Sequence, residues 1–171
     1  LTSIEEKIYK AVLLEVGVGI DGGEVFYGNI GSPERMTNTV IGDNVNSSSR
    51  LEGLTRVYKV PVICSEYVMN DALDSGCTTF RFQELDQVQV KGKTIGKRVY
   101  WPIQEDLIDD ELKTELEYFN KGLAAYFEGD WVSAAGDFKK CTLPLAEVFL
   151  ERTAGNESPK GWSGVWTMMT K

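Results

Sequence analysis

Hydrophobic and polar positions recur with two different periods along this chain, and each period predicts its own kind of element. Near the beginning, Ile4, Ile8 and Val12 recur every four residues, with charged residues between them. This spacing predicts a short amphipathic helix over residues 4–13. From residue 16 onward, apolar positions alternate with glycine or polar residues, which is typical of strands. We therefore expect a helix followed by the first strands of a sheet.

The first strand pair is expected around a glycine-rich turn. Residues 16–20 and 25–30 have the alternation of strands, and residues 21–23 (Asp-Gly-Gly) supply a tight turn between them. This pattern predicts a β-hairpin, which residues 31–33 (Gly-Ser-Pro) end. Residues 36–41 are then predicted to form a short extended stretch.

The middle of the chain mixes helices and strands. Asp43 is expected to cap a helix over residues 44–54. A short apolar strand follows at residues 60–63, and Ser65 can cap a second helix that Gly76 ends.

Three further strands are expected at residues 80–85, 88–90 and 98–103, where apolar positions again alternate. After them, residues 110–128 and 131–141 predict two helices on either side of a Gly-Asp break. Small residues between bulky aromatic ones make this helical pair similar to a single tetratricopeptide-type hairpin.

The change of composition after Pro102 predicts two regions, residues 1–103 and residues 104–171. A single helical hairpin cannot bury its own apolar face, so we expect it to pack on the first region or on a partner. Residues 161–169 could add a closing strand.

Charge and cysteine content exclude several classes of function. The 171 residues include 26 acidic and 18 basic ones, giving a net charge of −8, so a nucleic-acid partner is not expected. The 3 cysteines are odd in number and widely spaced, which favours a reducing compartment over a disulfide framework or a zinc site. No apolar run is long enough to span a bilayer. We expect a cytoplasmic segment without membrane contact, in a parent protein that could be anchored upstream, because the first residue is not Met.

Two groups of residues are candidates for phosphate chemistry. Asn46 and Arg50 lie one helical turn apart, and an amide and a guanidinium near a helix N-terminus can orient a sugar and neutralise charge on a phosphate. On the residues alone, the favoured alternative is that Asn46 belongs to a capping network and Arg50 is a solvated surface arginine. Lys91 and Lys93 flank a glycine between two strands and could hold phosphate oxygens, or could form an ordinary charged turn.

Several motifs together resemble the catalytic domain of class III adenylyl and guanylyl cyclases. They are the glycine-rich run at residues 18–36, the run Thr-Val-Ile-Gly-Asp-Asn-Val-Asn at 39–46, Ser-Arg-Leu-Glu-Gly-Leu at 49–54, and Phe-Gln-Glu-Leu-Asp at 82–86. The resemblance covers residues 10–103. It implies an α+β fold, an incomplete ferredoxin-like palm formed by the C-terminal half of the domain, with a helical hairpin appended to it.

The resemblance also implies a reaction and a set of site residues. In such cyclases the ribose 3'-hydroxyl attacks the α-phosphorus of the nucleotide and pyrophosphate leaves, at a site built from two protomers. By motif position, Asn46 would orient the ribose and Arg50 would stabilise the phosphorus transition state. Lys91 or Lys93 would hold the terminal phosphates. Thr39 falls at the purine-selecting position, where a small hydroxyl favours ATP over GTP.

The family's two metal-binding aspartates have no counterpart in this sequence. Asp21 and Asp43 belong to other motif positions: we expect Asp21 in the hairpin turn and Asp43 as a helix cap. The resemblance thus implies two Mg or Mn ions bound by the N-terminal half of the domain, and none by this chain. We expect the chain to be inactive alone and to act with that half or in a homodimer. The alternative is a noncatalytic cyclase-like module that regulates or binds a partner.

Overall fold

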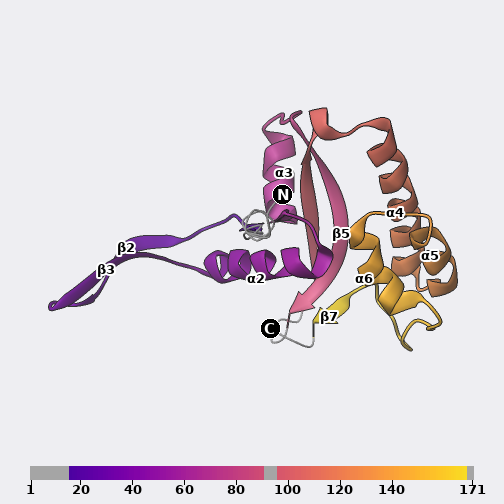
Figure 1. Ribbon diagram of the computed structural model, residues 1–171. Coiled ribbons are helices and arrows are strands. Elements are labelled where there is room, and N and C mark those ends of the chain that lie inside the picture. Colours follow the sequence, from indigo (N-terminus) through magenta and orange to yellow (C-terminus); the bar gives the residue numbers. More distant parts are fainter. Residues whose placement is uncertain (1–15, 91–95, 169–171) are drawn as a thin grey trace, which may run out of the picture.

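The computed structural model describes residues 16–90 and 96–168, which form a mixed α+β fold (Figure 1). The predicted helix at residues 4–13, together with Lys91 and Lys93, lies outside these described residues. The elements in chain order are β1 (Val18–Ile20), β2 (Phe26–Ser32), β3 (Arg35–Ile41), α2 (Asp43–Tyr58), β4 (Val62–Ser65), α3 (Glu66–Asp74), β5 (Phe80–Val90), β6 (Lys97–Gln104), a 3-10 turn (Glu105–Leu107), α4 (Asp110–Glu128), α5 (Trp131–Phe138), α6 (Pro144–Thr153) and β7 (Trp166–Met168).

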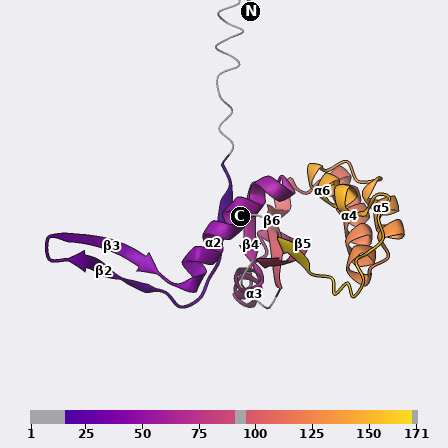
Figure 2. The ribbon, with the colours of Figure 1, turned by 90° about the horizontal axis from the view of Figure 1, so that it is seen from below.

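The described strands form two sheets. The larger has five strands in the order β1-β4-β6-β5-β7, in which β1 runs parallel to β4 and β7 runs parallel to β5. The smaller is the antiparallel pair β2–β3, which projects from the rest of the molecule as a long arm (Figure 1). Figure 2 shows this arm and the helices α4, α5 and α6 at opposite ends of the molecule, with α2 between them.

The hairpin predicted between residues 16–20 and 25–30 is wrong. Strand β1 instead pairs with β4, in the register Val18↔Val62, and β2 pairs with β3. The physical reason lies in the glycines of β1, which allow it to pack closely on α2. A Cβ atom at Gly19 would lie 2.2 Å from the carbonyl oxygen of Ser48, so only glycine permits this approach. Residues 31–33, expected to end a hairpin, help to form the turn of the real one.

Other predicted boundaries also differ from the structure. The strand expected at residues 60–63 is β4 at Val62–Ser65, and the helix expected over residues 131–141 is α5, which ends at Phe138. The strands expected at residues 80–85 and 88–90 are one continuous strand, β5, with an irregularity between Glu84 and Asp86 that changes its register against β6. The helix predicted over residues 44–54 continues to Tyr58.

Capping was predicted partly correctly. Gly42 is the N-cap of α2, without a side-chain hydrogen bond, so the prediction that Asp43 caps this helix is wrong. Asp43 is the first helical residue, where its charge still favours the positive end of the helix. Ser65 caps α3 as predicted, because its hydroxyl accepts a hydrogen bond from the Val68 N–H, and Gly76 follows the end of α3 with a φ of 78°.

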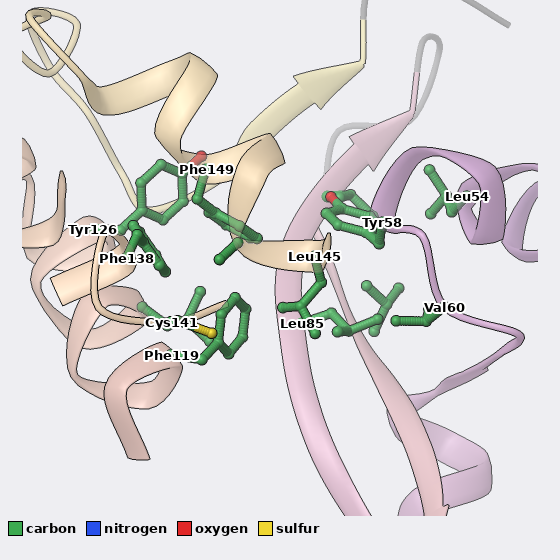
Figure 3. Packing of buried hydrophobic residues seen from close by; sticks show 14 of the residues in the cluster. Leu54, Tyr58, Val60, Leu85, Phe119, Tyr126, Phe138, Cys141, Leu145 and Phe149 are labelled. Carbon is green, nitrogen blue, oxygen red and sulfur yellow. The ribbon is translucent and has the colours of Figure 1, made fainter. Parts of the chain in front are cut away.

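The C-terminal helices share one hydrophobic core with the sheet and α2. Helices α4 and α5 occupy the two predicted helical segments, and α6, which the sequence analysis did not predict, follows them. Buried side chains from all parts form one cluster (Figure 3), whose members include Leu54, Tyr58, Ile63, Leu85, Val99, Phe119, Tyr126, Phe138, Leu145 and Phe149. The C-terminal region therefore packs on the first region of the same chain. Within the described part of the chain, no helix combines the length and the apolar character that crossing a membrane requires.

Candidate functional site

Helix α2 carries the two principal candidate residues. Asn46 and Arg50 lie in its first two turns, four residues apart, so their side chains emerge from the same side of the helix. Both residues are exposed. Within residues 16–90 and 96–168, neither side chain makes a hydrogen bond or ion pair, so both are available to a ligand or a partner surface.

Neighbouring residues on α2 make the ordinary structural contacts instead. The Asn44 amide donates to the Glu24 carbonyl at 3.1 Å, and the Ser48 hydroxyl donates to the Asn44 carbonyl at 2.9 Å. Neither contact caps α2, whose N-cap residue Gly42 makes no side-chain hydrogen bond. Arg56, further along the same helix, forms a bidentate ion pair with Glu52, with nitrogen–oxygen distances of 2.7 and 3.2 Å.

Asp21, directly after β1, fixes the start of α2. The sequence analysis expected Asp21 in a hairpin turn, and this prediction is wrong. Its side chain is only 2% exposed and does not lie in a hairpin turn. Its backbone N–H donates to the Ser48 hydroxyl at 3.1 Å, and its carboxylate lies 3.7 Å from the Lys97 ammonium. Burial raises the pKa of Asp21, but hydrogen bonds from Ser47 and Ser65, with smaller contributions from Gly22 and Lys97, outweigh it and hold that pKa below 3.8.

Of the other predicted binding residues, the structure describes Thr39 but not Lys91 or Lys93. Thr39 is half-buried on β3, opposite Gly28 in the arm. It precedes the first residue of α2 by four positions, so at about 3.3 Å per residue it lies roughly 13 Å along the chain from that helix. Lys91 and Lys93 lie outside the described residues, so their relation to Asn46 and Arg50 stays a prediction.

Large apolar side chains are exposed on the elements next to the candidate residues. Phe26 and Tyr27 on β2 are 65% and 67% exposed, and Ile41, just before α2, is 52% exposed. Others in the same segments are Val16, Val18, Ile20, Val25, Ile30, Met36, Val40 and Val45. Exposed apolar side chains concentrated on neighbouring elements are typical of a surface that contacts another protein surface.

The larger of two cavities among the described residues lies away from Asn46 and Arg50. A cavity of ≈ 810 Å³ lies at the far end of α2, where Thr55, Arg56 and Lys59 contribute to its lining together with residues 16–17, just before β1, and residues 60–61. Asn46 and Arg50 lie at the opposite end of the helix, on an open face. A nucleotide held by them would therefore need a second surface to enclose it.

Comparison with known proteins identifies the family. The sequence profile of the adenylate and guanylate cyclase catalytic domain matches residues 1–105. The chain belongs to this family. Among its relatives, the "Adenylate cyclase, terminal-differentiation specific" of Dictyostelium discoideum is 31% identical over 131 residues, covering 75% of this chain and 6% of that protein. The adenylate cyclase of Anabaena cylindrica is 39% identical over 88 residues, covering 51% of this chain and 17% of that protein.

This cyclase chain therefore spans a small part of the length of those two relatives. Among solved structures, the crystal structure of the adenylyl cyclase CyaB from P. aeruginosa is similar, with 23% identity and a TM-score of 0.45, covering 61% of this chain and 53% of that one.

The metal ions expected for a cyclase of this family find no ligand set here. Within residues 16–90 and 96–168, no group of three histidine, cysteine, aspartate or glutamate residues could hold a metal ion. The buried Asp21 is held instead by hydroxyls and Lys97.

Sequence reasoning missed a second polar cluster, at the other end of α2. Tyr58, Asp86 and Arg152 are buried and in mutual contact. Asp86 and Arg152 are 66 positions apart, so no local motif could have joined them. In the sequence, Asp86 follows the alternating residues 80–85, and nothing in that local pattern marks it as buried.

Proposed function

We propose that this chain provides the asparagine and arginine side of a nucleotide cyclase site that converts ATP to 3',5'-cyclic AMP and pyrophosphate. The observation that carries the proposal is the pair Asn46 and Arg50, exposed, unpaired among the described residues and one turn apart on α2, beside the apolar surface of the arm. Family membership supports the reaction class, and the two relatives compared above are named adenylate cyclases.

In the proposed reaction, this chain positions the nucleotide and supplies positive charge. The ribose 3'-hydroxyl oxygen forms a bond to the α-phosphorus while the bond from that phosphorus to pyrophosphate breaks, and the hydroxyl proton leaves. The Arg50 guanidinium meets the negative charge that grows on the α-phosphate oxygens, as a fixed cation does most effectively. Asn46 holds the ribose by its amide. Thr39 contacts the adenine edge, and Lys91 or Lys93 holds the terminal phosphates.

A second surface completes the proposed site. It is the N-terminal half of the domain, present as a separate chain or within a homodimer that includes it, and it would carry the carboxylates that bind two Mg or Mn ions, whose positive charge would assist the departure of pyrophosphate. The exposed apolar side chains of the arm and of β1 form the contact with that surface. In this proposal the five-stranded sheet is part of a ferredoxin-like palm, α4 and α5 are a tetratricopeptide-like extension, and the protein works in the cytoplasm.

The decisive experiment compares two arginines of the same helix. Turnover of Mn-ATP is measured for a domain that contains this chain together with the metal-binding carboxylates. Arg50→Ala should lower kcat by about 10² to 10³, because it removes a transition-state cation, while the affinity for ATP changes little. Arg56→Ala, which removes an exposed arginine paired with Glu52, should leave kcat within about twofold.

Two outcomes would overturn the proposal. Unchanged turnover in Arg50→Ala would remove the assigned role and favour the alternative, a noncatalytic cyclase-like module that regulates a partner. The chain on its own should form no cyclic AMP from Mg-ATP or Mn-ATP, and measurable product from a pure sample would show that the site does not need the N-terminal half of the domain.

A further inference from the structure

We propose that Arg152 is a positioning residue for the catalytic helix. Acting through Asp86, it holds Tyr58, the last residue of α2, and thereby fixes the helix whose first turns carry Asn46 and Arg50. The inference rests on the proposed function, and it makes the C-terminal helices part of the catalytic unit.

The cluster that carries this inference joins three parts of the fold. The Tyr58 hydroxyl, from α2, donates to the Asp86 Oδ2 atom of β5 at 2.6 Å. The Arg152 guanidinium, from α6, donates to the same oxygen at 2.7 Å and to the Tyr126 hydroxyl of α4 at 3.2 Å. Tyr58 and Asp86 are 0% exposed and Arg152 is 9% exposed. One carboxylate oxygen thus ties the catalytic helix to the C-terminal region.

The guanidinium is enclosed on its remaining sides. The Trp166 ring, from β7, lies 4.1 Å from its central carbon and the Phe149 ring lies 5.0 Å away. Burial alone would lower the pKa of Arg152, but Tyr58 and Asp86 more than offset it, so the pKa lies above its ordinary value and the group stays charged. The Arg152 guanidinium therefore stays charged, and the aromatic rings around it fix its orientation.

A buried ion pair of this kind is poorly explained by stability alone. Replacing such a pair by packed apolar residues is often neutral or stabilising. A charged cluster inside an otherwise apolar core therefore indicates that it fixes the relative positions of the elements it joins. The element whose position the cluster would fix is α2, a continuous helix of 16 residues. A second contact joins these helices at the protein surface, where Lys59, directly after α2, forms an ion pair with Glu147 of α6.

The two ends of α2 are anchored by different means. At the start, Gly42 offers no side-chain cap, and the contacts to β1 pass through Ser48 and Asp21. At the end, Tyr58 is held by the Asp86–Arg152 pair. A tilt allowed at Tyr58, about the anchor at Ser48, would displace Asn46 and Arg50, which lie on either side of that anchor, and a misplacement of about 1 Å can cost roughly a hundredfold in rate.

The test uses two matched tyrosines. Tyr58→Phe and Tyr126→Phe each remove one hydroxyl that contacts the Asp86–Arg152 pair, and both side chains are 0% exposed. Only Tyr58 lies on α2. Amide hydrogen exchange of residues 43–58 is measured in this chain, with the sheet strand β6 as the internal reference.

We expect exchange in α2, relative to β6, to become ~tenfold faster in Tyr58→Phe and to stay within ~twofold in Tyr126→Phe. Arg152→Lys, which keeps the charge but lacks the planar fork, should act like Tyr58→Phe. Equal acceleration of α2 by the two tyrosine variants would show a general loss of stability and would overturn the inference.

The second readout is catalytic and uses the domain that contains the metal-binding carboxylates. Tyr58→Phe should lower kcat by roughly tenfold with the KM for ATP within about twofold, and the loss should be smaller in an Arg50→Ala background, because part of it acts through the position of Arg50. Losses that multiply would contradict the inference while leaving Arg50 in its proposed role. If Arg50→Ala has no effect, the proposed function fails, and the exchange result then tests only whether Tyr58 anchors α2.

Discussion

Gly19 and Gly53 lie in adjacent elements, β1 and α2, but in opposite surroundings. A Cβ atom at Gly19 would collide with the α2 backbone, at 2.2 Å from both the Ser48 carbonyl oxygen and the Glu52 nitrogen. A Cβ atom at Gly53 would meet nothing within 4 Å. The first glycine is thus required by packing, and the second only raises the flexibility of the unfolded chain.

Gly53→Ala is therefore expected to increase the free energy of unfolding by about 0.5–1 kcal/mol, because alanine is the better helix former and no contact is strained. Urea unfolding followed by circular dichroism measures this difference. Gly19→Ala serves as the contrasting variant and should destabilise by about 1–3 kcal/mol. A loss of stability in Gly53→Ala would mean that this side of α2 is closely packed.

Asp21 should make stability depend on pH in acid. Its folded-state pKa lies below the ordinary 3.8, so its contribution is present above about pH 4 and disappears as the pH falls through the folded value. The difference in the free energy of unfolding between the wild type and Asp21→Asn should accordingly shrink between pH 6 and pH 3. Denaturant unfolding at both pH values tests this, and a constant difference would contradict it.

At the scale of elements, local signals predicted more than long-range ones. The cap at Ser65, the breaks around α4 and α5 and the alternation of β6 are set by neighbouring residues, and these elements lie where predicted. Helix α6, which begins at Pro144, was not predicted. The pairing of β1 with β4 depends on a helix packed against glycines, which alternation along one strand does not express.

The candidate site divides in the same way. Asn46 and Arg50 lie within a single helix, so their spacing alone placed them on one side of it. The Tyr58, Asp86 and Arg152 cluster brings together positions up to 94 apart, and only the folded topology could reveal it. Thr39 was correctly expected in an extended segment, but its distance from the nucleotide depends on the direction of the arm.

The helix α4 offers a test of capping with neighbouring aspartates. The Asp109 carboxylate accepts a hydrogen bond from the Leu112 N–H at 2.8 Å, whereas Asp110 forms only an exposed pair with Lys113. Asp109→Ala should cost about 1 kcal/mol of unfolding free energy, and Asp110→Ala less than half of that. Thermal unfolding of the two variants measures the difference, and equal costs would mean that charge near the helix end matters more than the cap.

For the whole molecule, the shared core predicts cooperative unfolding. Leu85 and Val99 of the sheet belong to the same buried cluster as Phe119, Phe138 and Phe149 of the C-terminal helices. Neither region can therefore open without exposing apolar surface of the other. Scanning calorimetry should show a single transition, with equal calorimetric and van't Hoff enthalpies, and two separate transitions would show that the regions fold independently.

The aromatic environment of Arg152 has a practical consequence. Three of the 4 tryptophans, Trp131, Trp162 and Trp166, form a chain of ring contacts at this junction, and the Trp162 indole N–H donates to the Tyr126 carbonyl at 2.9 Å. Indole emission shifts to longer wavelength when water reaches the ring. The protein thus contains its own fluorescent reporter, and its intrinsic tryptophan fluorescence should reveal whether the C-terminal strand is packed in place.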